Sequence, residues 1–149
     1  MPVSTALLIA GALVVLAVIG GFGMRMLDGR LRSGGDLRVR ADDLSGAVLA
    51  PGATLVQFST ELCARCPQVR RLLSEIAESR GGVEHVEIDL TNRNDLASRY
   101  HVLQTPTTFL VDASGAVLSR WGGVPDRRAI NEALASLKPL ATLQNQEQR

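Results

Sequence analysis

The stretch TLVQFSTELCARCPQVRRLL, residues 54–73, decides the fold of this chain. It opens with a mostly apolar run, which predicts a strand over 53–59 that is covered on both faces. From Cys63 to about Ser79 the apolar residues recur at helical spacing, so an amphipathic helix is expected to follow directly. Both cysteines of the chain, Cys63 and Cys66, lie where the strand gives way to the helix.

The rest of the chain alternates between strand and helix patterns. Short strands are predicted at 36–40, 53–59, 83–90, 107–111 and 116–121, and helices at 42–49, 63–79, 93–100 and 126–137. We expect Gly81-Gly82 to stop the second helix, and Thr91 or Asn92 to cap the third. Alternating elements favour parallel pairing, and a final hairpin at DASG adds an antiparallel edge. The pattern predicts an α/β fold with a mixed sheet flanked by helices.

The spacing of the two cysteines points to redox chemistry. Residues three apart share one helix face, so the two sulfurs can approach bonding distance. The ring closed by such a bond is too small to stabilise the fold much. Free amides and the helix macrodipole stabilise a thiolate at a helix start, and Arg65 adds a positive charge that should lower the thiol pKa further. We expect Cys63 to attack as the nucleophile and Cys66 to resolve the mixed disulfide.

Two other interpretations of the pair stay open. The cysteines could be inert core residues, or they could form half of a metal site. Zinc takes four ligands, the sequence has no second cysteine pair, and His85 and His101 do not lie at ligand spacing. We therefore predict no metal and no cofactor. The alternative function is a redox-inactive binding or assembly module that holds a client thiol or a metal such as copper.

Two stretches resemble the thioredoxin superfamily: TLVQFSTELCARCPQVRRLL and, at 98–123, SRYHVLQTPTTFLVDASGAVLSRWGG. The resemblance covers about residues 36–138 and implies a thioredoxin-like fold. It also implies that Pro106, preceded by Thr105, is the cis proline that faces the cysteine pair and binds an extended substrate. The implied activity is thiol-disulfide exchange with protein thiols and disulfides as partners.

The sequence departs from thioredoxins proper around this motif. Leu62 precedes the first cysteine, and Ala64-Arg65 separate the pair. Gln57 stands where thioredoxins have a buried Asp that aids proton transfer to the second cysteine. Arg71 replaces the proline that kinks the active-site helix. These changes argue against fast, thioredoxin-like reduction of many proteins and against recognition by a standard thioredoxin reductase. They leave the dithiol itself unchanged.

The N-terminal segment predicts a membrane anchor at residues 1–24. Residues 6–24, ALLIAGALVVLAVIGGFGM, are nineteen mostly apolar residues with no charge. As a helix they span about 28 Å, close to the roughly 30 Å hydrocarbon core of a bilayer. A cleaved signal peptide would have a basic start and a small-x-small cleavage site, and neither is present.

The distribution of charge predicts the membrane topology and bears on possible partners. Five arginines, at 25, 30, 32, 38 and 40, follow the apolar run and none precedes it, so the positive-inside rule favours a cytoplasmic domain over an extracytoplasmic one. We expect a basic flexible linker over 25–35, the thioredoxin-like domain over 36–138 and a polar tail over 139–149. The net charge of +1 argues against nucleic acid as a partner.

Overall fold

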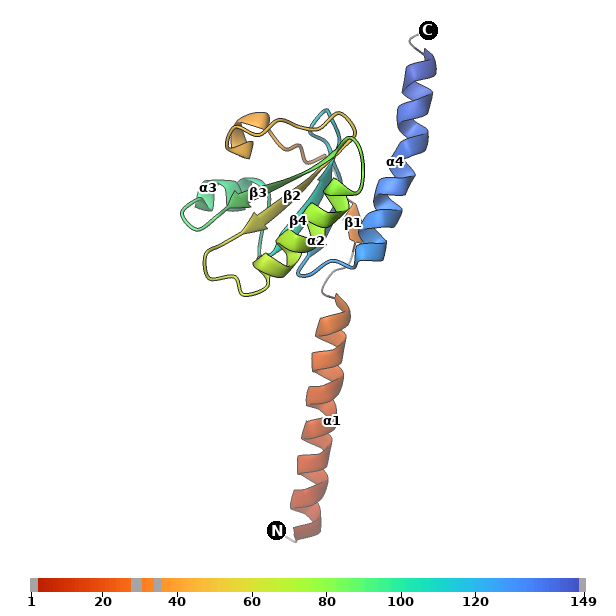
Figure 1. The fold of residues 1–149 in the computed structure, drawn as a ribbon. Coiled ribbons are helices and arrows are strands. Elements are labelled where there is room, and N and C mark those ends of the chain that lie inside the picture. The colour runs from red at the N-terminus through yellow and green to blue at the C-terminus, as the bar shows by residue number, and fades with distance from the viewer. Residues whose placement is uncertain (1–2, 28–30, 34–35, 148–149) are drawn as a thin grey trace.

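The computed structural model describes the backbone of residues 3–27, 31–33 and 36–147, and the side chains of residues 3–23 and 36–137. Figure 1 shows a long N-terminal helix that leads into a domain in which helices pack on a sheet. The elements, in chain order, are α1 (Val3–Leu27), β1 (Leu31–Ser33), the 3-10 helix η1 (Ala41–Leu44), β2 (Ala53–Ser59), α2 (Cys66–Glu78), β3 (Val83–Asp89), α3 (Asn94–Arg99), β4 (Thr107–Val111), β5 (Val117–Gly122) and α4 (Arg127–Glu147).

The five strands form one mixed sheet in the order β1-β5-β4-β2-β3. Strand β2 pairs in parallel with β3, with Ala53 opposite Val83, while the β2–β4, β4–β5 and β1–β5 pairs are antiparallel. Helices α2 and α4 cover one face of the sheet, and η1 and α3 cover the other (Figure 1). The α/β fold and the mixed sheet predicted from the sequence are confirmed.

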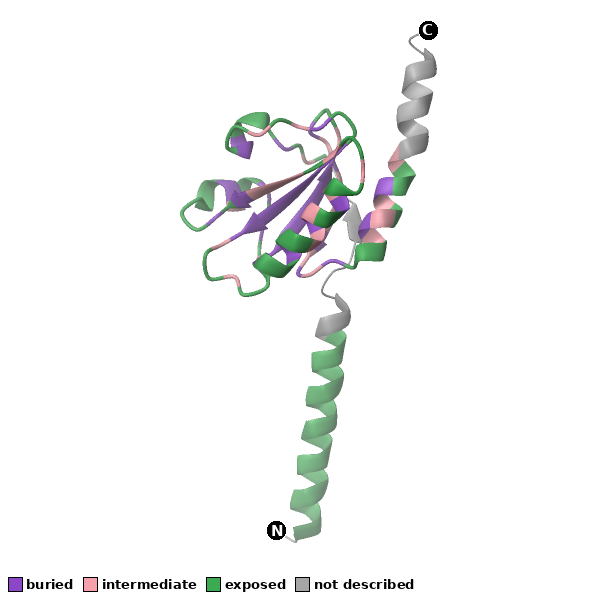
Figure 2. Ribbon diagram, viewed as in Figure 1, coloured by how far each residue is buried: buried purple, intermediate pink, exposed green. Residues whose placement is uncertain are grey.

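Strand β2 is buried along its whole length. All seven of its residues are buried, because β3 and β4 flank it and helices cover both of its faces (Figure 2). Its side chains alternate between two apolar cores. Leu55 packs with Leu73 of α2 and Ile130 of α4, whereas Val56 packs with the cluster on the η1 and α3 side. The apolar run in the sequence therefore predicted both the strand and its double burial.

The N-terminal part of the domain differs from the prediction. The strand expected at 36–40 is reduced to one isolated bridge between Arg38 and Ala116. Val39 donates a backbone hydrogen bond to Gly115 and is buried in the core, and the chain then turns into η1. The edge of the sheet is instead β1, at residues 31–33, which lie in the segment predicted to be a flexible linker.

Two helix boundaries and one predicted helix cap also differ. Helix α2 begins at Cys66, three residues later than predicted. Helix α3 has no side-chain cap from Thr91 or Asn92; the Thr91 hydroxyl instead donates to Asp89 and accepts a hydrogen bond from the backbone of Glu61. Helix α4 continues to residue 147, so most of the predicted polar tail at 139–149 is helical.

The hairpin between β4 and β5 forms as predicted. The Asp112 carboxylate accepts hydrogen bonds from the backbone and hydroxyl of Ser114 and from the backbone of Ala116. Gly115 has a φ of 88°, a conformation that favours glycine. This turn holds the last two strands of the sheet together.

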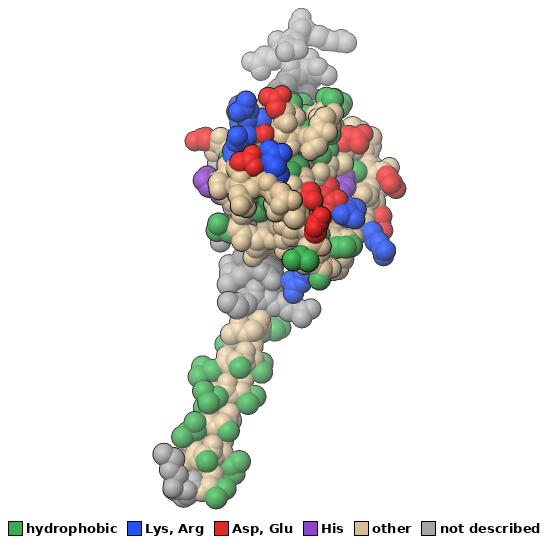
Figure 3. Space-filling view, turned by 90° about the vertical axis from the view of Figure 1, so that its left-hand side faces the viewer, with side chains coloured by type: hydrophobic (Ala, Val, Ile, Leu, Met, Phe, Trp, Pro, Cys, Tyr) green, Lys and Arg blue, Asp and Glu red, His purple; other side chains and the backbone are tan. Residues whose placement is uncertain are grey.

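Helix α1 is separate from both cores. Its window Val3–Gly23 has a mean hydropathy of 2.5, and none of it is buried in the domain (Figure 2). Figure 3 shows hydrophobic side chains along this helix, whereas acidic and basic side chains are interspersed on the domain above it. The helix is long and apolar enough to cross a membrane, and by position and composition it is an anchor or a signal sequence.

Candidate functional site

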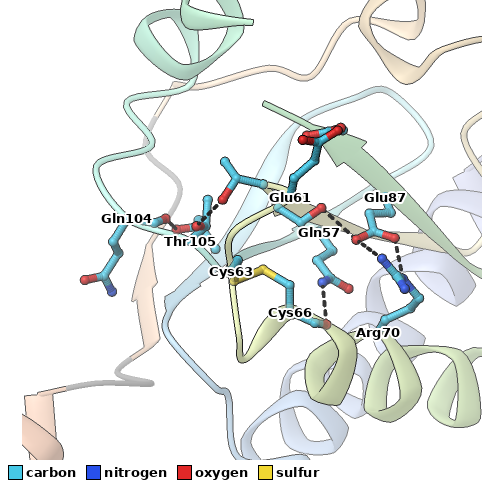
Figure 4. Close-up of a disulfide and its surroundings, with 12 residues drawn as sticks. Gln57, Glu61, Cys63, Cys66, Arg70, Glu87, Gln104 and Thr105 are labelled. Atoms are coloured by element: carbon cyan, nitrogen blue, oxygen red, sulfur yellow. Dashed lines mark hydrogen bonds and ion pairs between the residues drawn. A yellow bond between two sulfur atoms is a disulfide. The ribbon is translucent and has the colours of Figure 1, made fainter. Parts of the chain in front are cut away.

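The two cysteines form a disulfide at the start of α2 (Figure 4). The sulfurs are 2.08 Å apart and the Cα atoms 5.4 Å apart. Cys63 lies in the turn that follows β2, where its backbone N–H donates to Thr60, while Cys66 is the first residue of α2. Cys66 is 2% exposed, whereas Cys63 is only partly buried. One sulfur therefore faces the surface and the other faces the protein interior.

The start of α2 follows from its local sequence. Pro67 lies in the first turn, where a residue without an N–H costs no intrahelical hydrogen bond. The Cys66 N–H donates to the carbonyl of Cys63, which closes the turn between the cysteines. Arg65 occupies the N-cap position and is exposed. The helix predicted to begin at Cys63 therefore begins at Cys66, which is still the inner cysteine.

A second loop approaches the disulfide. The Thr105–Pro106 peptide bond is cis, as the resemblance implied, and Pro106 is buried. The hydroxyls of Thr60 and Thr105 are 3.2 Å apart and share a hydrogen bond, which joins the cysteine loop to the proline loop. Figure 4 shows Thr105 beside Cys63. The fold thus brings together site residues that are some forty positions apart in the chain.

Gln57 connects Cys66 to a histidine. It is fully buried, and its Nε2–H donates to the Cys66 carbonyl at 3.0 Å (Figure 4). Its Oε1 lies 3.1 Å from Nε2 of His85, and His85 Nδ1 lies 3.1 Å from the Ser74 hydroxyl. A continuous row of hydrogen bonds therefore runs from α2, through β3 and β2, back to the first residue of α2.

A carboxylate lies beside this row. Glu87 accepts a hydrogen bond from the Ser59 hydroxyl at 2.6 Å and forms an ion pair with Arg70 at 2.5 Å (Figure 4). Burial alone would raise the pKa of Glu87, but the hydrogen bonds from Arg70 and Ser59 and the charge of Arg70 outweigh it and lower that pKa. Glu87 is therefore held as an anion near the start of α2.

Sequence reasoning missed this polar group. From the sequence, His85 was noted only as a residue outside metal-ligand spacing, and 83–90 only as a strand. The available signal was parity: Gln57 and Ser59 alternate in phase on β2, and His85 and Glu87 do so on β3. Because the two strands pair in parallel, these four side chains share the face beneath α2.

The site can carry a two-electron dithiol–disulfide change, since both cysteines take part in it. Within the part of the chain whose side chains are described, no group of three or more His, Cys, Asp or Glu residues could hold a metal ion.

Comparisons with known proteins agree with this fold. The family model described as Thioredoxin matches residues 38–136. Among solved structures, a mutant thioredoxin from Halobacterium salinarum NRC-1 superposes with a TM-score of 0.54 and 23% identity, over 68% of this chain and 87% of its own. Oxidised mitochondrial thioredoxin 3 from Saccharomyces cerevisiae superposes with a TM-score of 0.50 and 19% identity, over 57% of this chain and 78% of its own. At these identities the structures are similar in fold. A search of curated proteins gave no match.

Proposed function

The chain belongs to the thioredoxin family, and from this premise we propose that it is a membrane-anchored thiol-disulfide oxidoreductase acting on protein thiols and disulfides. The observation that carries the proposal is the unequal exposure of the two cysteines. Cys63 is accessible at the rim of the site, whereas Cys66 is 2% exposed beneath it. A pair of this kind can meet a client with one sulfur and complete the exchange with the other.

The reduced protein would act on a client disulfide in two steps. The Cys63 thiolate attacks one client sulfur, the client S–S bond breaks, and the second client sulfur leaves as a thiolate that takes a proton. Cys66 then loses its proton and attacks the Cys63 sulfur, which breaks the mixed disulfide and releases the client sulfur that Cys63 had attacked, also as a thiolate. The client gains two electrons and the protein is left with its Cys63–Cys66 bond. The reverse sequence oxidises a client dithiol.

Three further residues have proposed roles at this site. Thr105 and Pro106 would bind the extended client next to Cys63. Arg65 would favour the Cys63 thiolate by its charge. Replacing Arg65 with Glu should raise the Cys63 thiol pKa, measured by the rate of alkylation against pH, and an unchanged profile would remove Arg65 from the mechanism.

Trapping tests the function. Cys66→Ser leaves Cys63 able to attack but removes the resolving thiol, so mixed disulfides with proteins should accumulate on non-reducing gels. Cys63→Ser is the matched control and should trap none. Trapping through Cys66 alone would reverse the assigned roles. If neither variant traps a protein and the native pair does not exchange with a protein disulfide, the redox-inactive binding module is the better description.

We also propose that α1 is retained as the anchor, with residues 25–35 as the connection and 36–138 as the catalytic domain. Support comes from the length and apolar composition of the helix. The protein should then fractionate with membranes and keep its N-terminus. A mature chain that starts after residue 24 would instead identify α1 as a signal sequence.

The arginines that follow α1 favour a cytoplasmic domain. A reporter that is active only in the cytoplasm should therefore work when fused after residue 149. Activity of a reporter that works only outside the membrane would place the domain on the extracytoplasmic side.

A further inference from the structure

The hydrogen bonds around Gln57 have only one consistent direction. Because the Cys66 carbonyl can only accept, the amide of Gln57 must present its Nε2–H there at 3.0 Å. Its Oε1 must then face His85 and accept, so His85 Nε2 carries a hydrogen. In the neutral ring Nδ1 is left as an acceptor, and the Ser74 hydroxyl donates to it at 3.1 Å. The buried carbonyl thereby fixes the orientation of Gln57 and the tautomer of His85.

His85 can gain a proton without breaking this arrangement. Protonation at Nδ1 leaves the Nε2–H bond to Gln57 unchanged, and the Ser74 hydroxyl can rotate to accept instead of donate. The ring also has access to solvent, since His85 lines a surface groove together with Ser74, Glu78 and Glu84. A proton can therefore reach His85 from outside, and the charge it brings lies one side chain away from Cys66.

The charges around His85 set the range in which it titrates. Burial lowers the pKa of His85 from its usual value near 6.5; Glu87 on the same strand raises it and Arg70 on α2 lowers it. Glu78 of α2 and Glu84 of β3 are the other charged side chains at the groove, and Gln57 is the neutral partner on β2. With the disulfide closed, His85 is thus mainly neutral at pH 7.

We propose that His85 links the redox state of the Cys63–Cys66 pair to protons, with Gln57 holding its imidazole in place behind Cys66. His85 is a positioning residue, since it touches neither sulfur in this row of contacts. The inference rests on the proposed function only in requiring that the disulfide can be reduced.

The charges of the reduced cysteine pair determine whether reduction raises or lowers the pKa of His85. Reduction by a small dithiol breaks the Cys63–Cys66 bond with two electrons, and the reductant closes to its own disulfide. The Cys66 sulfur takes one proton, and the Cys63 sulfur remains a thiolate above its own pKa. That negative charge favours the imidazolium, so the pKa of His85 should be higher in the reduced protein than in the oxidised one. Protonated His85 in turn favours the reduced pair, by reciprocity.

The first measurement is a titration of the histidine rings by NMR in the full-length protein in detergent micelles, oxidised and then reduced with dithiothreitol. The chain has only two histidines, and His101→Asn assigns their signals because Asn tolerates the positive φ of that position. The His85 pKa should rise on reduction by roughly half a pH unit, the order expected for a unit charge on Cys63, which lies beyond Gln57 and Cys66 at a partly solvated site. An equal His85 pKa in both states overturns the proposal.

The second measurement is the equilibrium with dithiothreitol between pH 5 and 8. His85→Gln keeps an N–H that can reach Gln57 but removes the charge. Relative to the native protein, its reduced form should become less favoured as the pH falls through the His85 pKa, by up to roughly three-fold where Cys63 is still a thiolate, and the two should converge at pH 8. His101→Asn should follow the native profile. Coincident native and His85→Gln profiles would overturn the proposal, and if the variant does not fold, the native NMR titration decides alone.

These outcomes are independent of the function test. No protein partner enters either measurement, so a failure to trap mixed disulfides leaves a redox-linked shift of His85 intact. Conversely, mixed disulfides that form while His85 titrates identically in both states would remove this inference alone.

Discussion

The two faces of the sheet differ in whether their buried polar groups have hydrogen-bond partners. On the face covered by η1 and α3, every described buried polar side chain has a hydrogen-bond partner: Asp43 bonds to Arg99 and Tyr100, Thr54 accepts from the backbone of Ala50, and Thr107 donates to the backbone of Gln104. On the face covered by α2 and α4, two buried atoms, Thr108 Oγ1 and Trp121 Nε1, have no hydrogen-bond partner among the described residues.

The polar groups of the α2 face that do have partners gather next to Cys66. Gln57 bonds directly to the Cys66 carbonyl, and Ser59 bonds to Glu87. The rest of that face is an apolar core beneath α2 and α4. One face of the sheet therefore stabilises the fold, and the other combines a core with the redox site. Buried polar groups that lack a partner cost stability, so the comparison can be tested residue by residue.

The largest expected effect is on the η1 and α3 face. Phe58 lies 5.4 Å from the ring of Tyr100 and 4.8 Å from that of Phe109, measured between centroids, and it is fully buried. Phe58→Ala should lower the free energy of unfolding by about 3–5 kcal/mol, because it removes these contacts and leaves a cavity. Chemical denaturation of the oxidised protein measures this loss.

The same variant tests the division between the faces. If the η1 and α3 face serves stability alone, Phe58→Ala should leave the dithiothreitol equilibrium of the cysteine pair unchanged wherever the variant is folded. Leu62→Ala is the control: this side chain is 97% exposed, so its loss should change stability by less than about 0.5 kcal/mol. A shifted redox equilibrium in Phe58→Ala would show that the faces are coupled.

A smaller effect is expected at the buried carboxylate of that face. Asp43 is 8% exposed and accepts hydrogen bonds from Arg99, at 2.8 Å, and from the Tyr100 hydroxyl. Asp43→Asn should lower the free energy of unfolding by about 2–3 kcal/mol at pH 7, because charged hydrogen bonds are lost and Arg99 keeps its charge. Urea denaturation of both proteins gives the difference.

The same contacts predict how the difference in unfolding free energy between the native protein and Asp43→Asn depends on pH. Burial alone would raise the pKa of Asp43, but the bonds from Tyr100 and Arg99 and the charge of Arg99 outweigh it and lower the pKa below 3.8. A carboxyl whose folded pKa lies below its unfolded one stabilises the fold above the unfolded pKa, and this contribution is lost as the pH falls through the folded pKa. The gap between native and Asp43→Asn should thus be constant above about pH 5 and narrow below pH 4. A difference in unfolding free energy that stays constant down to pH 2 would contradict this prediction.

The smallest effects come from a matched pair of Thr→Val substitutions. Thr54 and Thr108 are both fully buried strand residues, but only Thr54 Oγ1 has a partner among the described residues, the Ala50 N–H at 2.9 Å. Thr54→Val should lower the free energy of unfolding by about 1–2 kcal/mol, whereas Thr108→Val should raise it by about 0.5–1 kcal/mol, since valine has the same shape and no unmatched hydroxyl. If both substitutions lowered the free energy of unfolding equally in the same denaturation experiment, the proposed difference in hydrogen bonding between the two faces would be wrong.

The sequence alone determined the elements whose patterns are local. The apolar run at 53–59 is β2 over the same residues, and the helical spacing that follows Cys63 is α2. The strands at 83–90 and 107–111 were found because alternation and apolar runs follow from local chain geometry, and the turn at 112–115 because Asp112 and Gly115 carry its chemistry. The cysteine pair and the proline before the fourth strand were likewise readable, since each is defined by neighbours in the chain.

Only the tertiary structure decided what depends on partners distant in sequence. Strand β1 forms because β5 offers it an edge, and α3 begins without the Thr91 cap because that hydroxyl is taken by Asp89 and the backbone of Glu61. His85 became part of the site in the same way. The alternation of 83–90 showed that His85 shares a face with Glu87, but not that the face lies beneath α2, against Gln57. Periodicity fixes which residues share a face, and only packing fixes what that face meets.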